Sequence, residues 1–379
     1  MDDIQEAAPG LEARTALVER LVEVIGWPQS RIPGVERQIV GDVLYPLLRN
    51  ADRRQRLRCA QSIARLVEPP RRLLRFLACD DIAIARPLLI ESPALRDVEA
   101  LAVVQNGAAA HWRVLAQRRD LTASVCDALV ETQDRQTIEA LLANSDAPLC
   151  NATIDSLTVL AEEFRALIPL LLERQELTAS QGLSLFWWAD HEGRERALRR
   201  FAVDRTVLLS ELSDLFSRAA REAWSDPGVM RALGFLERRQ RRRAQNDILP
   251  LEVKISTLPM GGLDEADVLS IAEVCGLTPI TAERVLSDPG GEPIAVLAKA
   301  VGLDRPIAER LWRATGAPVS AAEDRSQPFG RMRYVYETLP TAKAQTVLRY
   351  WNWSLTADAI ARGRMGLEAS ESGMFSRGL

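Results

Sequence analysis

Residues Leu171-Leu172-Glu173-Arg174-Gln175-Glu176-Leu177 end one apolar segment, pass through a polar turn and reach an anchor leucine before the next apolar segment begins. The same pattern occurs three times upstream, in Leu89 to Leu95, Leu115 to Leu121 and Leu142 to Leu149. The anchors lie six or seven residues apart and the units 26 to 29 apart. Repetition at a period of 20 to 50 residues is typical of a solenoid, in which each unit buries its apolar face by stacking on its neighbours.

The segments between these turns have the spacing of amphipathic helices. The clearest stripe follows positions i, i+3, i+4, i+7 and i+8, in Phe164, Leu167, Ile168, Leu171 and Leu172. Capping residues occupy or adjoin the start of the second helix of each pair, at Asp97, Thr122, Asn151 and Thr178. Thr178 and Gln181 together form the pattern of a capping box. Caps repeated at the same phase support a true structural repeat.

The composition favours an all-α globular protein. Of the 379 residues, 47% are hydrophobic and 26% charged, and no Val/Ile/Thr-rich alternating runs bounded by turns are present. The net charge of −4 creates no global field that would attract nucleic acid or an anionic membrane. The five cysteines are dispersed among apolar residues, the N-terminus is acidic, and no charge-free stretch is long enough to span a bilayer. We therefore expect a soluble, cytoplasmic protein.

The repeats divide the chain into five predicted regions. These are N-terminal capping helices over 1–50, a helical-repeat array over 51–216, a helical connector with an arginine cluster and a joint over 217–262, tandem helical hairpins over 263–317, and a linker, terminal helix and frayed tail over 318–379. In the first region, the second helix carries an apolar stripe of Val35, Ile39, Val43 and Leu47. The predicted fold is an α-solenoid of stacked hairpins, of HEAT-like or leucine-rich-variant type, followed by a second helical array.

The second array repeats almost residue for residue. Residues 271–286 align with 297–312 at a shift of 26, and Gly276 matches Gly302. Each glycine falls where a helix must end in a left-handed residue, and Thr278 or Asp304 can cap the helix that follows. The segment also resembles a DNA-binding helix-turn-helix, although its second helices open with Pro279 or with Arg305 and proline.

Known catalytic motifs are missing from the sequence. No phosphate-binding glycine loop, no Gly-x-Ser-x-Gly and no His-Glu-x-x-His occurs, and the chain has two histidines, His111 and His191. The strongest enzymatic pattern is Asp190-His191-Glu192, but adjacent side chains on a helix or turn point in different directions. We predict a non-enzymatic protein with no cofactor and no metal site.

Two arginine-rich segments are the predicted binding residues. The first comprises Arg194, Arg196, Arg199, Arg200 and Arg205. Three of these share a helix face that would bind carboxylates or phosphates of a partner. The second comprises Arg238, Arg239, Arg241, Arg242 and Arg243, which are suited to nucleic-acid phosphates. Both segments also fit a simpler interpretation as solvated helix surfaces paired with nearby acids.

Several stretches resemble DUF2336, a bacterial domain of unknown function. They are Ile84 to Leu95, Leu121 to Val130, Phe186 to Ala189 and Gly290 to Leu303, and the resemblance would cover most of residues 50–315. It implies a helical-repeat fold and carries no known activity, cofactor or catalytic residue. We therefore predict a scaffold or adaptor that binds a protein partner in bacterial regulation. The alternative is a nucleic-acid-binding regulator that uses residues 264–315 and the Arg238–Arg243 cluster.

Overall fold

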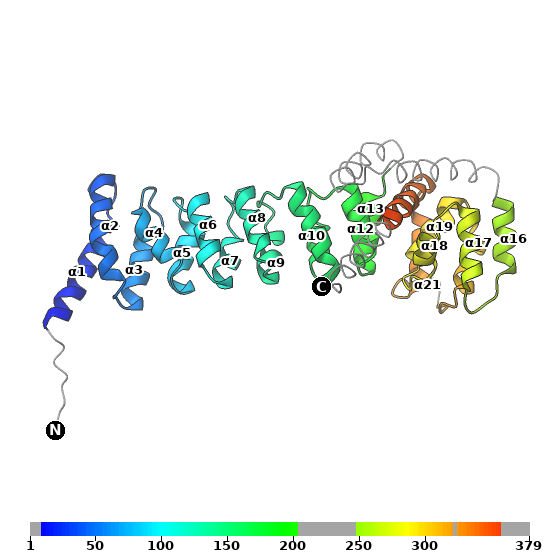
Figure 1. Ribbon diagram of the computed structural model, residues 1–379, viewed down its shortest axis with the longest axis horizontal. Coiled ribbons are helices and arrows are strands. Elements are labelled where there is room, and N and C mark those ends of the chain that lie inside the picture. The colour runs from blue at the N-terminus through cyan, green and yellow to red at the C-terminus, as the bar shows by residue number, and fades with distance from the viewer. Residues whose placement is uncertain (1–8, 204–247, 321–323, 358–379) are drawn as a thin grey trace, which may run out of the picture. The chain divides into compact units, whose positions relative to one another are not determined.

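The computed structural model describes residues 9–203, 248–320 and 324–357, and every regular element in these ranges is a helix (Figure 1). The predicted all-α class is confirmed. The chain forms two compact units, Met1–Glu176 and Leu177–Leu379. Their boundary lies inside the region predicted as one array over 51–216.

The first unit is built from short helices that alternate between two rows. The bounds are α1 Pro9–Ile25, α2 Gly34–Leu48, α3 Arg53–Ile63, α4 Arg71–Ala78, α5 Ile82–Glu91, α6 Asp97–Asn106, α7 Ala109–Leu115, α8 Ala123–Glu131, α9 Arg135–Ala143, α10 Asn151–Glu163 and α11 Leu167–Leu171. Even-numbered helices from α2 to α10 pack each on the next even helix, and odd-numbered helices from α1 to α11 do the same (Figure 1). Each helix therefore buries its apolar face against neighbours close in sequence.

Polar side chains in the turns link successive units of this row. Arg118 donates to the carbonyl oxygens of Leu89 at 2.8 Å and Ser92 at 3.1 Å. Asn144 donates in turn to the carbonyls of Ala116 at 2.9 Å and Arg118 at 2.5 Å. We call the series formed by Arg118, Asn144, Arg174 and their carbonyl acceptors the turn ladder. It runs through the four polar turns that define the repeat in the sequence.

Arg174 forms the last step of the turn ladder. Its guanidinium donates to the carbonyls of Asn144 at 2.6 Å and Ala147 at 2.5 Å. The side chain is almost fully buried, and Glu176 pairs with it at 2.5 Å. Arg118 is equally buried and pairs with Asp120 at 2.7 Å, also two residues downstream. Both arginines therefore satisfy buried backbone acceptors while a nearby carboxylate balances their charge.

The apolar stripe predicted for the second helix is wrong for three of its four members. Val35, Ile39 and Val43 are 75%, 59% and 50% exposed. The helix instead buries the face of Arg37, Gly41, Leu44 and Leu48. Gly41 lies against Pro70, where a β-carbon would clash, so this face allows the close approach to α4.

Asp134 joins α7 to α9 in the first unit. Its two carboxylate oxygens accept from Arg113 Nε and Nη2, both at 3.0 Å, and it caps α9 by accepting from the Thr137 amide at 2.9 Å. The hydrogen bonds from Arg113, followed by those from Thr137, hold the pKa of Asp134 below its ordinary value of 3.8 despite the opposing effect of burial. The ionised form is therefore the one that stabilises the fold.

We expect Asp134→Asn to lower the melting temperature at pH 7 by about 2–4 °C, because asparagine keeps the cap but loses the ion pair. Because the pKa of Asp134 is lower in the folded state than in the unfolded state, its ionisation stabilises the protein at pH values above the unfolded-state pKa. This stabilisation is lost as the pH falls towards the folded-state pKa. The difference from wild type should therefore shrink below pH 3.8. Denaturant unfolding at pH 7, 5 and about 3 measures this trend; a difference that stays constant over this range would contradict it.

The second unit surrounds a buried helix, α19. The bounds are α12 Ala179–Leu185, α13 His191–Phe201, α16 Ile248–Thr257, α17 Glu265–Cys275, α18 Pro279–Leu286, α19 Glu292–Val301, α20 Arg305–Ala314, α21 Pro328–Thr338 and a further helix over 341–357. Every residue of α19 from Glu292 to Ala298 is buried, and α18, α20 and α21 pack on it. Phe186, Trp312 and Trp351 are fully buried in the same unit.

The repeated glycines behave as predicted. Gly276 and Gly302 end α17 and α19 with φ of 69° and 84°, in the left-handed region. In each copy the next leucine donates back into the helix, from Leu277 to Ala272 at 2.9 Å and from Leu303 to Ala298 at 3.0 Å. Thr278 caps α18 through the Thr281 amide, whereas Asp304 occupies the cap position of α20 without a side-chain cap bond. The capping box of Thr178 and Gln181 is also present.

Candidate functional site

Arg194, the first residue of the predicted partner-binding set, lies inside the second unit. Its guanidinium donates to both carboxylate oxygens of Asp288, at 2.6 and 2.8 Å, and to Glu292 at 3.1 Å. Arg331 lies 3.1 Å from the other oxygen of Glu292. We call these four residues the buried ion network. It joins α13 and α21 to the start of α19, and Arg194, at 9% exposure, is not part of an exposed face.

The position of Arg194 follows from helical spacing. The buried face of α13 contains residues at i, i+3, i+4 and i+7, namely Arg194, Ala197, Leu198 and Phe201. Arg196 is two residues further on and points away from this stripe. Because the segment is rich in arginine, its composition predicts an exposed helix. The helical spacing of Arg194 with Ala197, Leu198 and Phe201 is the signal that places this arginine on the buried face.

The remaining predicted arginines have different surroundings. Arg199 and Arg200 are exposed on α13, and Arg196 is half-buried. The Arg200 guanidinium lies 4.8 Å from the ring centre of Phe201. Arg205 and the whole cluster Arg238, Arg239, Arg241, Arg242 and Arg243 lie outside the described residues.

Burial affects both Glu292 and Arg194 in the buried ion network. It raises the pKa of Glu292 above its ordinary value, and the positive charges of Arg194 and Arg331 offset only part of this effect. Burial also acts to lower the pKa of Arg194, but the hydrogen bonds and charges of Asp288 and Glu292 outweigh it and raise that pKa. The arginine stays charged, and the carboxylates depend on it.

The Asp190-His191-Glu192 segment serves mainly to start α13. Asp190 accepts from the Gly193 amide at 2.8 Å and caps the helix, while His191 and Glu192 are exposed. His191 borders a hollow of about 350 Å³. Nearby, Arg325 pairs with Glu195 at 2.7 Å and stacks 3.6 Å from the ring centre of Tyr334. The charged groups beside His191 are therefore largely engaged with one another.

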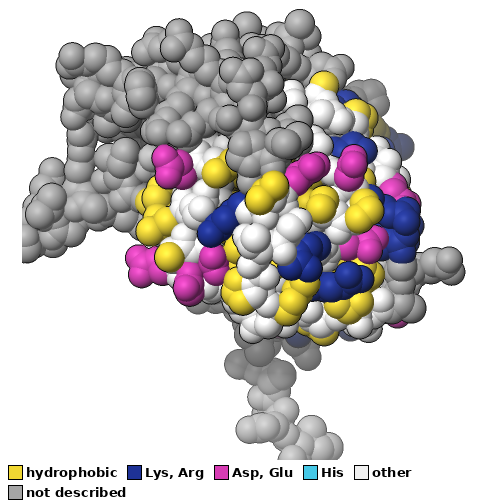
Figure 2. All heavy atoms as spheres, turned by 90° about the vertical axis from the view of Figure 1, so that its right-hand side faces the viewer, with side chains coloured by type: hydrophobic (Ala, Val, Ile, Leu, Met, Phe, Trp, Pro, Cys, Tyr) yellow, Lys and Arg dark blue, Asp and Glu magenta, His cyan; other side chains and the backbone are white. Residues whose placement is uncertain are grey.

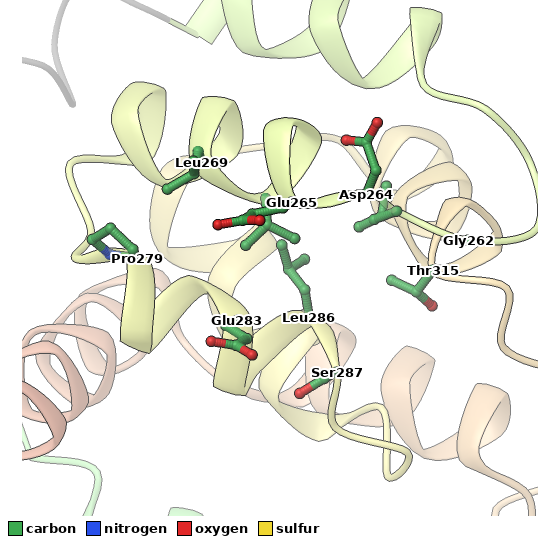
Figure 3. A pocket seen from close by; sticks show the side chains of 11 residues that line it. Gly262, Asp264, Glu265, Leu269, Pro279, Glu283, Leu286, Ser287 and Thr315 are labelled. Carbon is green, nitrogen blue, oxygen red and sulfur yellow. The ribbon is translucent and has the colours of Figure 1, made fainter. Parts of the chain in front are cut away.

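A groove lies between α17 and α18 in the tandem hairpins (Figure 3). It has a volume of about 510 Å³ and lies within the second unit. Its apolar lining consists of Leu263, Val268, Leu269, Pro279 and Leu286, and its acidic lining of Asp264, Glu265 and Glu283. Gly262, Ser287 and Thr315 complete it. We call this feature the α17–α18 groove.

The three acidic residues of the groove differ in their engagement. Asp264 caps α17 through the Asp267 amide at 2.7 Å, and its carboxylate points away from Leu286 (Figure 3). Glu265 and Glu283 are exposed and come from opposite helices. Within the part of the chain that the structure describes, neither has an ion-pair partner, and no basic residue lines the groove. Among the described residues, the groove therefore combines an apolar floor with negative charge that no ion pair offsets.

The exposed side chains at the starts of α18 and α20 differ from those expected of a helix-turn-helix recognition helix. A recognition helix presents hydrogen-bonding or basic side chains at its start, where they reach base edges. The start of α18 exposes Pro279, Ile280 and Glu283. At the start of α20, Arg305 pairs with Glu337 at 3.2 Å. The amide of Thr278 donates to Asn352 at 2.8 Å, so the helix over 341–357 packs against this end of α18.

The profile of the DUF2336 family, described as an uncharacterised protein conserved in bacteria, matches residues 84–349. The chain belongs to the DUF2336 family. The match begins within α5 and ends within the helix over 341–357, so this family region includes all four turns of the ladder, the buried ion network and the α17–α18 groove. No curated protein and no solved structure matches the chain.

Membrane-spanning helices and metal-binding clusters are both absent from the described ranges of this DUF2336 protein. Among the helices described, none combines the length and apolar character needed to cross a membrane. Within the same ranges, no three His, Cys, Asp or Glu side chains are grouped so that they could hold a metal ion.

Proposed function

We propose that this protein is a non-enzymatic helical-repeat scaffold that binds a protein partner. In this proposal the first unit is an α-solenoid of stacked hairpins, of HEAT-like or leucine-rich-variant type, and the second unit supplies the binding site. The dispersed free cysteines, two of them fully buried, suit action in the reducing bacterial cytoplasm. A role in bacterial regulation is the setting we favour.

The packing of the first unit supports the solenoid. Its helices contact neighbours in sequence and helices two positions away, which is the contact pattern of stacked repeats. The turn ladder recurs with separations of 26 to 30 residues, close to the period of the sequence repeat. Stacked repeats of this kind present extended surfaces for partners.

The observation that carries the binding proposal is the α17–α18 groove. Its apolar floor and two carboxylates without a described ion-pair partner are the combination expected where a partner docks, because exposed apolar surface gains free energy on burial and unpaired charge attracts and orients a complementary partner. Hydrophobic side chains also lie among acidic and basic ones on the face at the α16 end of the second unit (Figure 2). Arg196, Arg199 and Arg200 on α13 form a second candidate surface.

Affinity capture from a lysate of the native host tests this function. The full chain is compared with Glu265→Lys/Glu283→Lys, with Arg196→Glu/Arg199→Glu/Arg200→Glu, and with a control, Glu131→Lys/Asp146→Lys, which changes two exposed acids of the first unit. We expect a protein that the wild type and the control retain equally and that the groove variant loses by about tenfold or more.

Capture of the same proteins in the same amounts by all variants would contradict the proposal. An unchanged partner list for the α13 variant would exclude that helix alone. Circular dichroism confirms that each variant is folded, which is expected because all the substituted groove and control residues are exposed.

A further inference from the structure

We infer that the α17–α18 groove binds a short basic segment of a partner protein, with an apolar side chain on the groove floor and arginine or lysine side chains on Glu265 and Glu283. This inference rests on the proposed function and names the chemistry of the partner. Each part of it follows from a separate property of the groove.

The floor of the groove calls for an apolar side chain. Leu269, in the groove lining, is 45% exposed, and Ile280, which follows the lining residue Pro279 but is not itself part of the lining, is 43% exposed. Leu263 and Val268 are half-buried in the same lining, and Leu286, which is only 5% exposed, lies at the base of the space between α17 and α18 (Figure 3). Single exposed apolar residues are common, but a contiguous set inside a concavity is typical of a binding site. An aliphatic or aromatic anchor would remove this surface from water.

The charge of the groove selects a cationic partner. Glu265 stands in the first turn of α17 and Glu283 in the middle of α18, so one carboxylate flanks the floor from each helix (Figure 3). The nearby basic residues have other contacts: Lys254 is 3.5 Å from Asp267, and the Arg284 guanidinium lies 5.3 and 5.5 Å from the ring centres of Trp187 and Trp188. Arginine suits this site best, because its planar guanidinium binds a carboxylate through two parallel hydrogen bonds.

Other cationic or charged ligands fit less well. Phosphates of nucleic acid or lipid fit poorly, because all the charged side chains in the lining are negative. A divalent cation needs several converging oxygen ligands, and the described residues contain no such group. A polyamine would satisfy the carboxylates but offers no side chain for Leu269 and Leu286. A polypeptide supplies both the charge and the apolar anchor.

The groove is held in shape before any partner arrives. The Gly262 amide donates to the Ala314 carbonyl at 3.0 Å, which ties the turn before α17 to the end of α20. Gly316 has a φ of 79° and lies close to Gly261. A β-carbon on residue 316 would be 3.0 Å from the carbonyl carbon of Gly261. Little reorganisation is then needed on binding, which favours measurable affinity for a short segment.

The test uses a synthetic helical peptide with two leucines one turn apart, flanked by arginines, and the full chain. We expect a dissociation constant of about 10–100 μM by fluorescence anisotropy in about 50 mM salt, and at least tenfold weaker binding in about 300 mM salt. Glu265→Lys/Glu283→Lys should weaken binding about tenfold or more, while Glu131→Lys/Asp146→Lys, with the same change in net charge, should stay within about twofold. Replacing the leucines with serine should weaken it at least about fivefold.

Equal affinity for the groove variant and its control would overturn the inference. So would undiminished binding of the serine peptide, or full competition by spermidine, because either would show charge attraction without an apolar anchor. A free peptide of residues 236–247, from the arginine run outside the described residues, is the final competitor. If it binds at least tenfold more tightly than the synthetic peptide, the groove belongs to this chain's own segment and not to a partner.

The peptide test and affinity capture distinguish failure of the basic-segment inference from failure of the scaffold proposal. A partner lost from the groove variant, together with no peptide binding, would uphold the scaffold function and overturn the basic chemistry. Peptide binding at the groove without any captured partner would uphold the basic chemistry and count against the scaffold function.

Discussion

Replacing Arg194 with methionine is expected to lower the free energy of unfolding of the second unit by about 4 kcal/mol, because it leaves buried carboxylates without their cation. Methionine keeps much of the volume and the apolar contacts of the arginine stem. Asp288 loses both of its bonds from Arg194, and Glu292 keeps only Arg331. Urea unfolding monitored by tryptophan fluorescence measures the loss, since Trp187 and Trp351 lie in this unit.

The loss should depend on pH in a defined direction. The folded-state pKa of Glu292 is already raised, and removal of Arg194 raises it further. A group whose pKa is raised on folding contributes stability that is fully present at pH values below its unfolded-state pKa, which is 4.5 for Glu292. That stability is lost as the pH rises through the folded-state pKa. The destabilisation by Arg194→Met should therefore be smaller at pH 5 than at pH 8.

Two further variants isolate the cause. Arg199→Met makes the same substitution at an exposed position of α13 and should change stability by less than about 0.5 kcal/mol. Adding Glu292→Gln to Arg194→Met removes one of the stranded carboxylates and should restore part of the loss at pH 8. Equal destabilisation by Arg194→Met and Arg199→Met would show that the buried ion network does not stabilise the unit.

Replacing Arg174 with lysine is expected to cost the first unit about 3 kcal/mol, because two buried carbonyl groups lose a donor. Lysine keeps the positive charge and can still approach Glu176. Its single ammonium group cannot reproduce the planar fork that reaches Asn144 and Ala147 at once. The expected result therefore separates backbone hydrogen bonding from charge.

Arg119→Lys provides the matched control, because Arg119 is exposed in the turn beside Arg118. Thermal unfolding of both variants should show a clear loss for Arg174→Lys and almost none for Arg119→Lys. Similar melting temperatures for Arg174→Lys and wild type would mean that water replaces the lost donors and that the turn ladder contributes little.

Local sequence rules were sufficient for the helices and their ends. The left-handed Gly276 and Gly302 and the capping box at Thr178 follow from side-chain chemistry within a few residues, and all were predicted. The polar turns of the first unit were recognised as repeats, but their hydrogen bonds were not. Arg174 donates to carbonyls 27 and 30 residues away. Every residue has a backbone carbonyl, so the sequence does not indicate which ones accept a hydrogen bond.

Residues whose role depends on tertiary contacts were missed. Val35 and Ile39 are apolar at helical spacing, yet the helix buries the opposite face, where Gly41 permits close packing. The α17–α18 groove shows the same limit. Glu283 and Glu309 are equivalent in the sequence repeat, but Glu309 pairs with Arg305 and Arg333, at 3.5 and 3.4 Å, whereas Glu283 remains exposed in the groove.

The turn ladder makes the stability of each repeat depend on the next. Arg118 both donates to the turn before it and accepts, through its carbonyl, from Asn144 in the turn after it. If one turn frays, a neighbour loses its donor or is left with an unsatisfied buried carbonyl. We therefore expect the segment from Leu89 to Glu176 to unfold as a cooperative block, with a free energy of local opening close to that of opening the whole segment.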